Sequence, residues 1–268
     1  MLDGLGIHQY PARTPHSELT PMDDTRRIHI SVRQTLDWSD QASVEAHLIP
    51  DFRAKYDMWN RMFTMPYHVF RRRLTAIAER SLHAVDGATL SPIDEVPDGD
   101  IVIPVDDDDW FAPTLAAKIR AAGDAQTTGW LWRRTALEYR APWKRMRRLI
   151  GRLVGSRPEF TCLTNNYAFR LERPRAAAMM NHALATPFFD DPAAPVAHIP
   201  ELLGVQNRSL ASQTSLAWRR PSIERAALIE LFERHRALHA SWRPTPGLEW
   251  AEPYAAAMAV LMREIAVK

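Results

Sequence analysis

Alternating apolar and polar residues predict several short strands. In Arg27–Val32, three β-branched residues alternate with polar ones, which is typical of a half-buried strand. The continuous run Ile101–Val105 indicates a buried strand, and Pro104 within it marks an edge or the end of regular pairing. Two longer segments, 129–139 and 159–170, are also predicted to be strands. The pattern therefore predicts a β-sheet.

A helical spacing of apolar residues recurs elsewhere along the chain. It runs from 67 to 85, with Gly87 where such a helix would stop. Pro113 suits the first position of a helix that ends at Gly123. Further helices are predicted after Pro174 (176–184), after Ser222 (223–240) and after Pro253 (254–265), while 187–200 is expected to be irregular. Strands that alternate with helices indicate an α/β protein.

Composition narrows the function classes. Lys and Arg number 34 and Asp and Glu 32, so the net charge of +2 argues against a dedicated nucleic-acid binder. The single cysteine, Cys162, excludes a disulfide within the chain and a Cys-rich zinc site. There is no apolar run of about 18 residues and no secretory signal pattern, so a cytoplasmic location is expected. Residues 1–25 are polar and proline-containing and are expected to form an arm before the domain at 26–268.

Four consecutive carboxylates, Asp106–Asp109, follow the predicted strand 101–105 and precede a helix. Ligands of open α/β sheets bind at the carboxyl ends of strands. Adjacent carboxylates repel one another, and Mg²⁺ or Mn²⁺, which prefer oxygen ligands, would remove that repulsion and hold a diphosphate. The alternative interpretation is an acidic surface loop or a helix cap. The pattern favours a metal and diphosphate site.

The segment Ile-Val-Ile-Pro-Val-Asp-Asp-Asp-Asp-Trp-Phe-Ala-Pro, 101–113, resembles the D-x-D segment of nucleotide-sugar glycosyltransferases of the GT-A type, closest to short bacterial rhamnosyltransferase-like enzymes. The resemblance implies one α/β domain with a central mixed, mostly parallel sheet flanked by helices, with C-terminal helices within 222–266. It implies that Asp106–Asp109 bind Mn²⁺ or Mg²⁺ and the diphosphate of a nucleotide-sugar donor. Segments 160–170 and 205–214 are similar to later sugar- or acceptor-site segments of that family.

Transfer with inversion requires a general base that deprotonates the acceptor hydroxyl. Asp190 and Asp191 are the candidates, because two adjacent carboxylates can raise the pKa of one of them. His198 is a candidate metal ligand beside Asp108, as a downstream histidine is in some enzymes of this type. The competing interpretation of all three is an ordinary solvated loop. Candidate sugar- or acceptor-binding residues are Asn165, Asn166, Tyr167, Asn207 and Ser212.

The segment 140–157 is basic and interleaved with apolar residues. Such a segment can lie on an anionic membrane surface or hold a phosphorylated acceptor, although a solvated helix face explains it as well. The expected partners are therefore a nucleotide-sugar donor and a glycan, lipid-linked or small-molecule acceptor, with peripheral membrane contact through 140–157.

Two other functions remain open from the sequence. A Mg²⁺-dependent isoprenoid-diphosphate enzyme also carries Asp-rich motifs, but it needs them on a helix. A non-catalytic carbohydrate-binding module on a degenerate transferase fold would keep the architecture and lose turnover. The sequence favours the metal-dependent glycosyltransferase.

Overall fold

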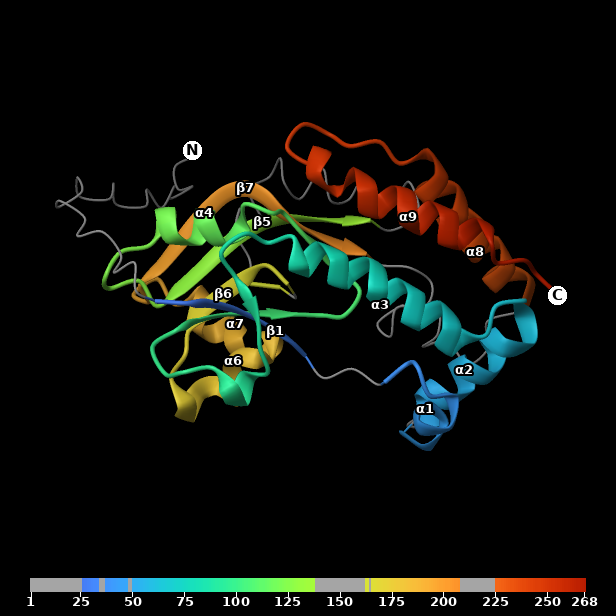
Figure 1. Cartoon of the computed structure of the whole chain (residues 1–268), viewed down its shortest axis with the longest axis horizontal. Helices are drawn as coiled ribbons and strands as arrows, with labels where there is room; N and C mark the ends of the chain where they lie inside the picture. The colour runs from blue at the N-terminus through green and yellow to red at the C-terminus, as the bar shows by residue number, and fades with distance from the viewer. Residues whose placement is uncertain (1–25, 34–36, 48–49, 138–161, 164, 208–224) are drawn as a thin grey trace, which may run out of the picture.

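The computed structural model describes residues 26–33, 37–47, 50–137, 162–163, 165–207 and 225–268. Within these ranges, strands form one seven-stranded sheet in the order β2-β1-β3-β6-β5-β7-β4 (Figure 1). Their bounds are β1 Ile28–Val32, β2 Thr89–Leu90, β3 Ile101–Val105, β4 Trp110–Phe111, β5 Gly129–Leu137, β6 Tyr167–Arg170 and β7 Val196–Asn207.

The sheet is mixed. Strand β1 pairs in parallel with β2 and β3, and β5 pairs in parallel with β7. Strand β6 lies antiparallel between β3 and β5, and β4 is antiparallel to β7. Consequently β1, β2, β3, β5 and β7 all point the same way, and their carboxyl ends share one edge of the sheet. An α/β protein with a mixed sheet is thus confirmed.

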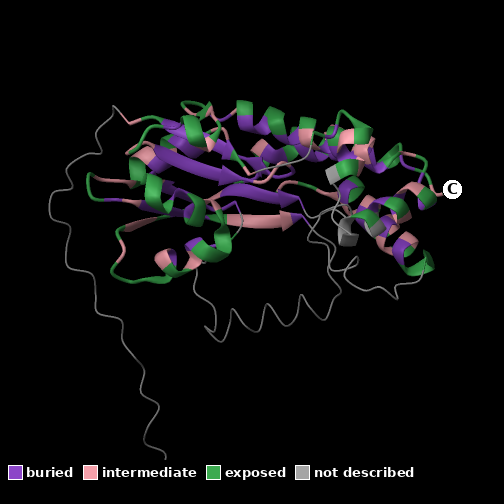
Figure 2. Cartoon of the chain, turned by 90° about the horizontal axis from the view of Figure 1, so that it is seen from below, coloured by how far each residue is buried: buried purple, intermediate pink, exposed green. Residues whose placement is uncertain are grey.

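Helices cover both faces of this sheet. The alternation of β-strand side chains sends Ile28, Ile30 and Ile103 to one face, where they pack with α4 (Leu115–Ala122) and the end of α3 (Tyr67–His83). Val102 and Phe169 point to the other face, which α6 (Ala176–Met180) and α7 (His182–Asp190) cover. Buried strands between helices with exposed outer faces are visible in Figure 2.

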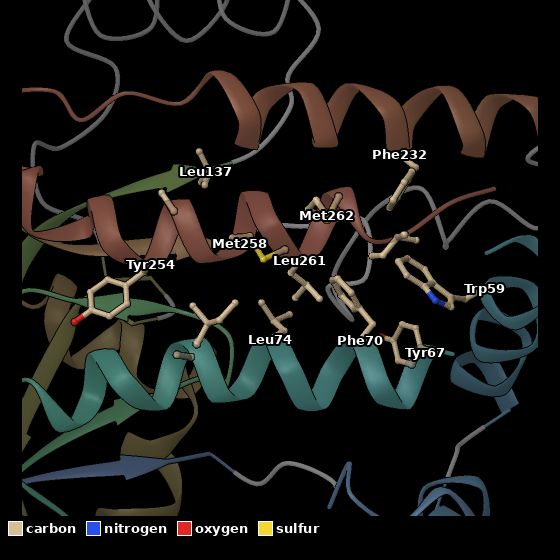
Figure 3. Packing of buried hydrophobic residues seen from close by; sticks show 14 of the residues in the cluster. Trp59, Tyr67, Phe70, Leu74, Leu137, Phe232, Tyr254, Met258, Leu261 and Met262 are labelled. Atoms are coloured by element: carbon tan, nitrogen blue, oxygen red, sulfur yellow. The ribbon is translucent and has the colours of Figure 1, made fainter. Parts of the chain in front are cut away.

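A second, mainly helical cluster adjoins the sheet. It joins α1 (Gln41–His47) and α2 (Pro50–Met62) to α3, α8 (Arg225–Ser241) and α9 (Glu252–Arg263). Figure 3 shows α3 and α9 side by side, with Leu74 and Phe70 facing Leu261. The sequence pattern did not predict α1 and α2. The short turns η1 (Ile93–Glu95), η2 (Arg173–Arg175) and η4 (Glu249–Ala251) complete the described elements.

Several predicted elements are confirmed. The strand over 101–105 and the helix from Tyr67 agree with β3 and α3, and Gly87 adopts φ +75° beyond the helix end. Pro104 is tolerated in β3 because pairing with β6 involves only Ile101 and Val102. On its other side, β3 is hydrogen-bonded to β1 through alternate residues, so Pro104 is not one of the residues that must donate. One of the bonding residues is Val105, whose carbonyl accepts from the Arg33 N–H at 2.8 Å.

Other predicted elements are wrong in extent. The strand expected over 159–170 is only β6 in the described chain, because Cys162, Leu163, Asn165 and Asn166 lie outside any strand. The irregular stretch expected over 187–200 contains the end of α7 and the start of β7. Pro200 lies in β7 where the β5–β7 register shifts, so this strand tolerates a proline at a bulge. The short strand β4 stands between the aspartates and α4.

Some predictions concern parts of the chain that are not described. The arm at 1–25, the basic segment 140–157, Ser212 and the Ser222 cap lie outside the described residues. The division into an arm and one domain therefore stays a prediction. Among the described helices, none is long and apolar enough to cross a membrane.

Candidate functional site

Polar groups from the ends of three other strands meet Asp106–Asp109, which lie on a turn after β3. Arg33 follows β1, Asn165 precedes the antiparallel β6, and Asn207 ends β7. Parallel strands bring their carboxyl ends to one edge, and an antiparallel strand brings its amino end there. The topology therefore assembles this cluster from distant parts of the sequence.

Arg33 and Asn165 hold Asp106. The Arg33 guanidinium donates to Asp106 Oδ1 at 2.8 Å, to the Tyr167 hydroxyl at 3.2 Å and to the Met180 carbonyl at 2.8 Å. Burial acts to lower the pKa of Arg33, but Asp106 and Tyr167 outweigh it and raise that pKa. Arg33 therefore stays charged and ties β1 to the acidic turn.

Asn165 bridges two of the aspartates. Its side-chain nitrogen donates to Asp106 Oδ2 at 3.1 Å and to Asp109 Oδ2, while its Oδ1 accepts from the Asp106 backbone N–H at 2.8 Å. This last bond fixes which way the amide points, because only the oxygen can accept. Asn165 adopts φ 64°, a conformation that asparagine tolerates better than most residues. Its NH₂ group thus stands between two carboxylates.

Arg71 of α3 neutralises the other side of the turn. Its guanidinium donates to Asp107 Oδ1 at 2.6 Å and to Asp108 Oδ2 at 3.1 Å, and it lies 5.1 Å from the centre of the Trp38 ring. Arg71 is 1% exposed. Burial acts to lower its pKa, but the two carboxylates more than reverse this and the pKa is raised. A permanently charged, buried cation thus links α3 to the acidic turn.

Asp108 and Asp109 are too buried to ionise easily. They are 9% and 1% exposed. Burial, reinforced by the neighbouring carboxylates, raises the pKa of Asp108 to about 7 despite Arg71. The same causes raise the pKa of Asp109 well above its ordinary value, although the Asn207 N–H donates to its Oδ1 at 2.8 Å. A proton or another positive charge is therefore favoured here.

The cluster offers donors for a hard divalent cation. One carboxylate oxygen each from Asp106, Asp108 and Asp109 lie within 4.8 Å of one another. An all-oxygen set suits Mg²⁺ or Mn²⁺, and each oxygen has a second lone pair beyond its hydrogen bond. Arg33 and Arg71 pair directly with three of the four carboxylates, and the charge of Arg134 also attracts Asp109. The residues present therefore fit a divalent ion.

Other predicted site residues lie at or near the cluster with different roles. Asn165 and Asn207 contact Asp109 directly. Tyr167 is fully buried: its hydroxyl donates to the Met179 carbonyl at 2.8 Å and its ring packs against Phe189, so the ring has no exposed face for a sugar in this structure. Asn166 is 3% exposed, donates to the Trp132 carbonyl and accepts from the Leu163 N–H, so it holds the backbone instead of a sugar.

The remaining candidates lie on other elements than the aspartates. His198 pairs with Leu131 near the start of β7, nine residues before Asn207, which corresponds to roughly 30 Å of extended strand. It therefore cannot share a metal with Asp108. Asp190 ends α7 and Asp191 follows it. The first residue of α7, His182, interacts electrostatically with Asp106, and Asp190 lies eight residues further, about 12 Å along the helix. Asp191 accepts from the Ala193 N–H at 2.9 Å, as in a solvated turn.

Sequence reasoning missed Arg33 and Arg71. Arg71 falls on the apolar stripe of α3, four residues after Tyr67 and three before Leu74, all of them buried. A charged residue on a buried helix face requires a partner, so this position was the available signal. For Arg33, the only sequence feature that could have indicated a role in the site is its position directly after a predicted strand.

Comparison with known proteins adds no relative: no family model, no curated protein and no solved structure matches this chain.

Proposed function

We propose that the protein is a metal-dependent glycosyltransferase with a GT-A-type fold, which moves a sugar from a nucleotide-diphosphate donor to an acceptor hydroxyl. The observation that carries the proposal is the convergence of carboxylate oxygens from Asp106, Asp108 and Asp109, which lie within 4.8 Å of one another at the carboxyl edge of an α/β sheet. That edge is where α/β proteins bind their ligands.

Charge explains why the ligand would be a diphosphate held through a cation. Burial raises the pKa values of Asp108 and Asp109, so the site favours an added positive charge. Mg²⁺ or Mn²⁺ would supply that charge and would neutralise the diphosphate as it leaves. The protein itself adds Arg33 beside Asp106, and Arg134, whose charge attracts Asp109. Guanidinium groups suit phosphate oxygens because they donate in a fork.

The acceptor is proposed as a glycan, a lipid-linked sugar or a small molecule with a free hydroxyl. A cytoplasmic enzyme with peripheral membrane contact through 140–157 agrees with the basic, apolar pattern of that segment.

The isoprenoid-diphosphate alternative is less well supported. Such an enzyme needs its aspartates along a helix, whereas Asp106–Asp109 occupy a turn after β3. A non-catalytic module remains distinguishable by experiment, because it would bind a nucleotide without turning it over.

Thermal unfolding with nucleoside diphosphates tests the proposal. The protein is titrated with UDP, GDP, dTDP, ADP and CDP, each with and without Mn²⁺. We expect at least one of them to raise the melting temperature only when Mn²⁺ is present, since a ligand of the folded state adds RT ln(1 + [L]/Kd) to stability. The matching nucleotide-sugar should then release its diphosphate in a Mn²⁺-dependent reaction.

Matched variants make the test specific to the site. Asp106→Asn removes one proposed metal oxygen with little change in shape and should abolish the Mn²⁺-dependent shift. Asp94→Asn, an exposed aspartate in η1, should leave it unchanged. Absence of a Mn²⁺-dependent shift with every diphosphate would contradict the proposal, and binding without turnover would favour the non-catalytic module.

A further inference from the structure

A second group of chemically competent side chains lies away from the acidic turn. Ser91 follows β2, His29 lies in the middle of β1, and Asp100 directly precedes β3. The Ser91 hydroxyl is 3.0 Å from His29 Nδ1, and His29 Nε2 is 3.1 Å from Asp100 Oδ2. The three side chains therefore form a continuous hydrogen-bonded series from hydroxyl to imidazole to carboxylate.

The chemistry of these groups sets the direction of each bond. A carboxylate only accepts, so His29 Nε2 carries the proton that is donated to Asp100. In a neutral imidazole the other nitrogen then holds a lone pair, and the Ser91 hydroxyl donates to it. This is the tautomer in which a histidine can take a proton from a serine.

The backbone holds all three members in place. The Ser91 N–H donates to the Ile30 carbonyl at 3.0 Å, and the Arg27 N–H donates to Asp100 Oδ1 at 3.3 Å. The His29 side chain is 7% exposed and that of Asp100 15%, while Ser91 is partly exposed. Base and carboxylate are thus shielded, and Ser91 is the member whose residue is partly exposed. His29 precedes Arg33 by four residues, roughly 13 Å along β1, so this group is separate from the aspartates.

We propose that Ser91, His29 and Asp100 form a nucleophilic site that accepts acyl groups from small activated esters. Ser91 Oγ attacks the carbonyl carbon, and its proton passes to His29 Nδ1. The bond from carbon to the leaving oxygen breaks, and that oxygen departs with the electron pair and receives the proton from His29. Water then hydrolyses the Ser91 ester by the same route, with His29 as the base.

Labelling of the full-length protein with diisopropyl fluorophosphate tests the site. The Ser91 oxygen would form a bond to phosphorus, fluoride would leave, and His29 would take the proton. We expect one adduct in the intact mass, localised to Ser91 by peptide mass spectrometry, and a burst of p-nitrophenol from p-nitrophenyl acetate. His29→Gln should slow both reactions by at least about 100-fold, the lower range for a general base.

The controls separate a catalytic from a structural role. Ser39 also donates to a carboxylate, that of Asp37, and Ser39→Ala should label like the wild type. A purely structural network would show altered stability in Ser91→Ala with no adduct in the wild type. The proposal is overturned if the folded wild-type protein gains no adduct at Ser91, or if His29→Gln is labelled as fast as the wild type. Neither of these two measurements requires that the Ser91→Ala variant folds.

Discussion

Arg71, buried on α3, donates a 3.1 Å hydrogen bond to Asp108 on the turn after β3. The same guanidinium contacts Asp107, so one cation joins the helical cluster to the sheet at the candidate site. Removing one partner of a buried pair leaves the other charge without compensation, which costs more than the pair itself contributes. The stability of the fold and the electrostatics of the site are therefore coupled through Arg71.

Arg71→Ala should lower the free energy of unfolding by about 3–5 kcal/mol, the usual cost of an uncompensated buried charge. Arg73→Ala on the same helix is the matched control. Arg73 pairs with Glu264 at the surface, where such a bond contributes at most about 1 kcal/mol. Urea unfolding of both variants measures the difference. Equal, small losses would show that Arg71 is not needed to balance the aspartates.

Asn165 gives a second stability prediction. Its NH₂ group bridges Asp106 and Asp109, and its φ is 64°. In EDTA, Asn165→Ala should lose about 2–4 kcal/mol, because the carboxylates lose a shared donor and alanine is strained at this φ. Asn165→Gly should lose about 1 kcal/mol less, since glycine adopts this conformation freely.

The effect of Mn²⁺ on stability should distinguish the bridging role of the Asn165 amide from ordinary packing. If the amide occupies the place of a cation, Mn²⁺ should restore more stability to Asn165→Gly than it adds to the wild type. Asn166→Ala removes a neighbouring buried amide that donates to the Trp132 carbonyl and accepts from the Leu163 N–H, and it should not be rescued. If Mn²⁺ restores stability to both Asn165→Gly and Asn166→Ala, or to neither of them, the bridging role of the Asn165 amide is contradicted.

Proton competition predicts how metal affinity depends on pH. The pKa of Asp108 is raised to about 7, and that of Asp109 is also raised, mainly by burial. Below pH 7 a proton on Asp108 occupies an oxygen that a cation would use, so this carboxylate alone should lower Mn²⁺ affinity by up to about tenfold per pH unit. Calorimetry at pH 6, 7 and 8, in buffers of different ionisation enthalpy, measures both affinity and protons released. A constant affinity with no proton release would contradict metal binding at these carboxylates.

The sequence predicted what local patterns determine. Alternation and β-branched runs identified β1 and β3, and the apolar stripe identified α3, because these elements bury the faces that their own residues define. The position of Asp106–Asp109 after a buried strand was predicted for the same reason. These predictions required no knowledge of distant contacts.

The sequence could not predict which distant residues would meet the aspartates. Arg33 follows β1 and Asn165 precedes β6, so the sheet order brings them together, while Arg71 comes from the packing of α3 against the sheet. His198 was misplaced because 187–200 contains four prolines and was expected to be irregular. Instead β7 continues through Pro200 at a bulge, and His198 lies near the start of this strand, nine residues before Asn207.

A histidine pair on α8 predicts acid sensitivity of the helical cluster. His235 and His239 are 6% and 2% exposed, and neither ring nitrogen of His239 has a hydrogen-bond partner among the described residues. Burial lowers the pKa of His235 to about 4. Burial and the neighbouring His235 lower the pKa of His239 to about 3. Both rings are therefore neutral in the folded protein at neutral pH.

The direction of the pH effect follows from these depressed values. Between pH 6.5 and the folded-state pKa values, the unfolded chain binds more protons, so stability must fall as pH falls. For His239 alone the loss from pH 7 to pH 5 is about 2 kcal/mol. His239→Leu should flatten this part of the stability profile, whereas His83→Leu, at an exposed position of α3, should not. Urea unfolding of the wild type and of both variants across pH 5–7 measures these profiles. Parallel profiles for the wild type and His239→Leu would contradict the prediction. They would mean that water already reaches the His239 imidazole and that α8 packs less tightly against α9 than in this structure.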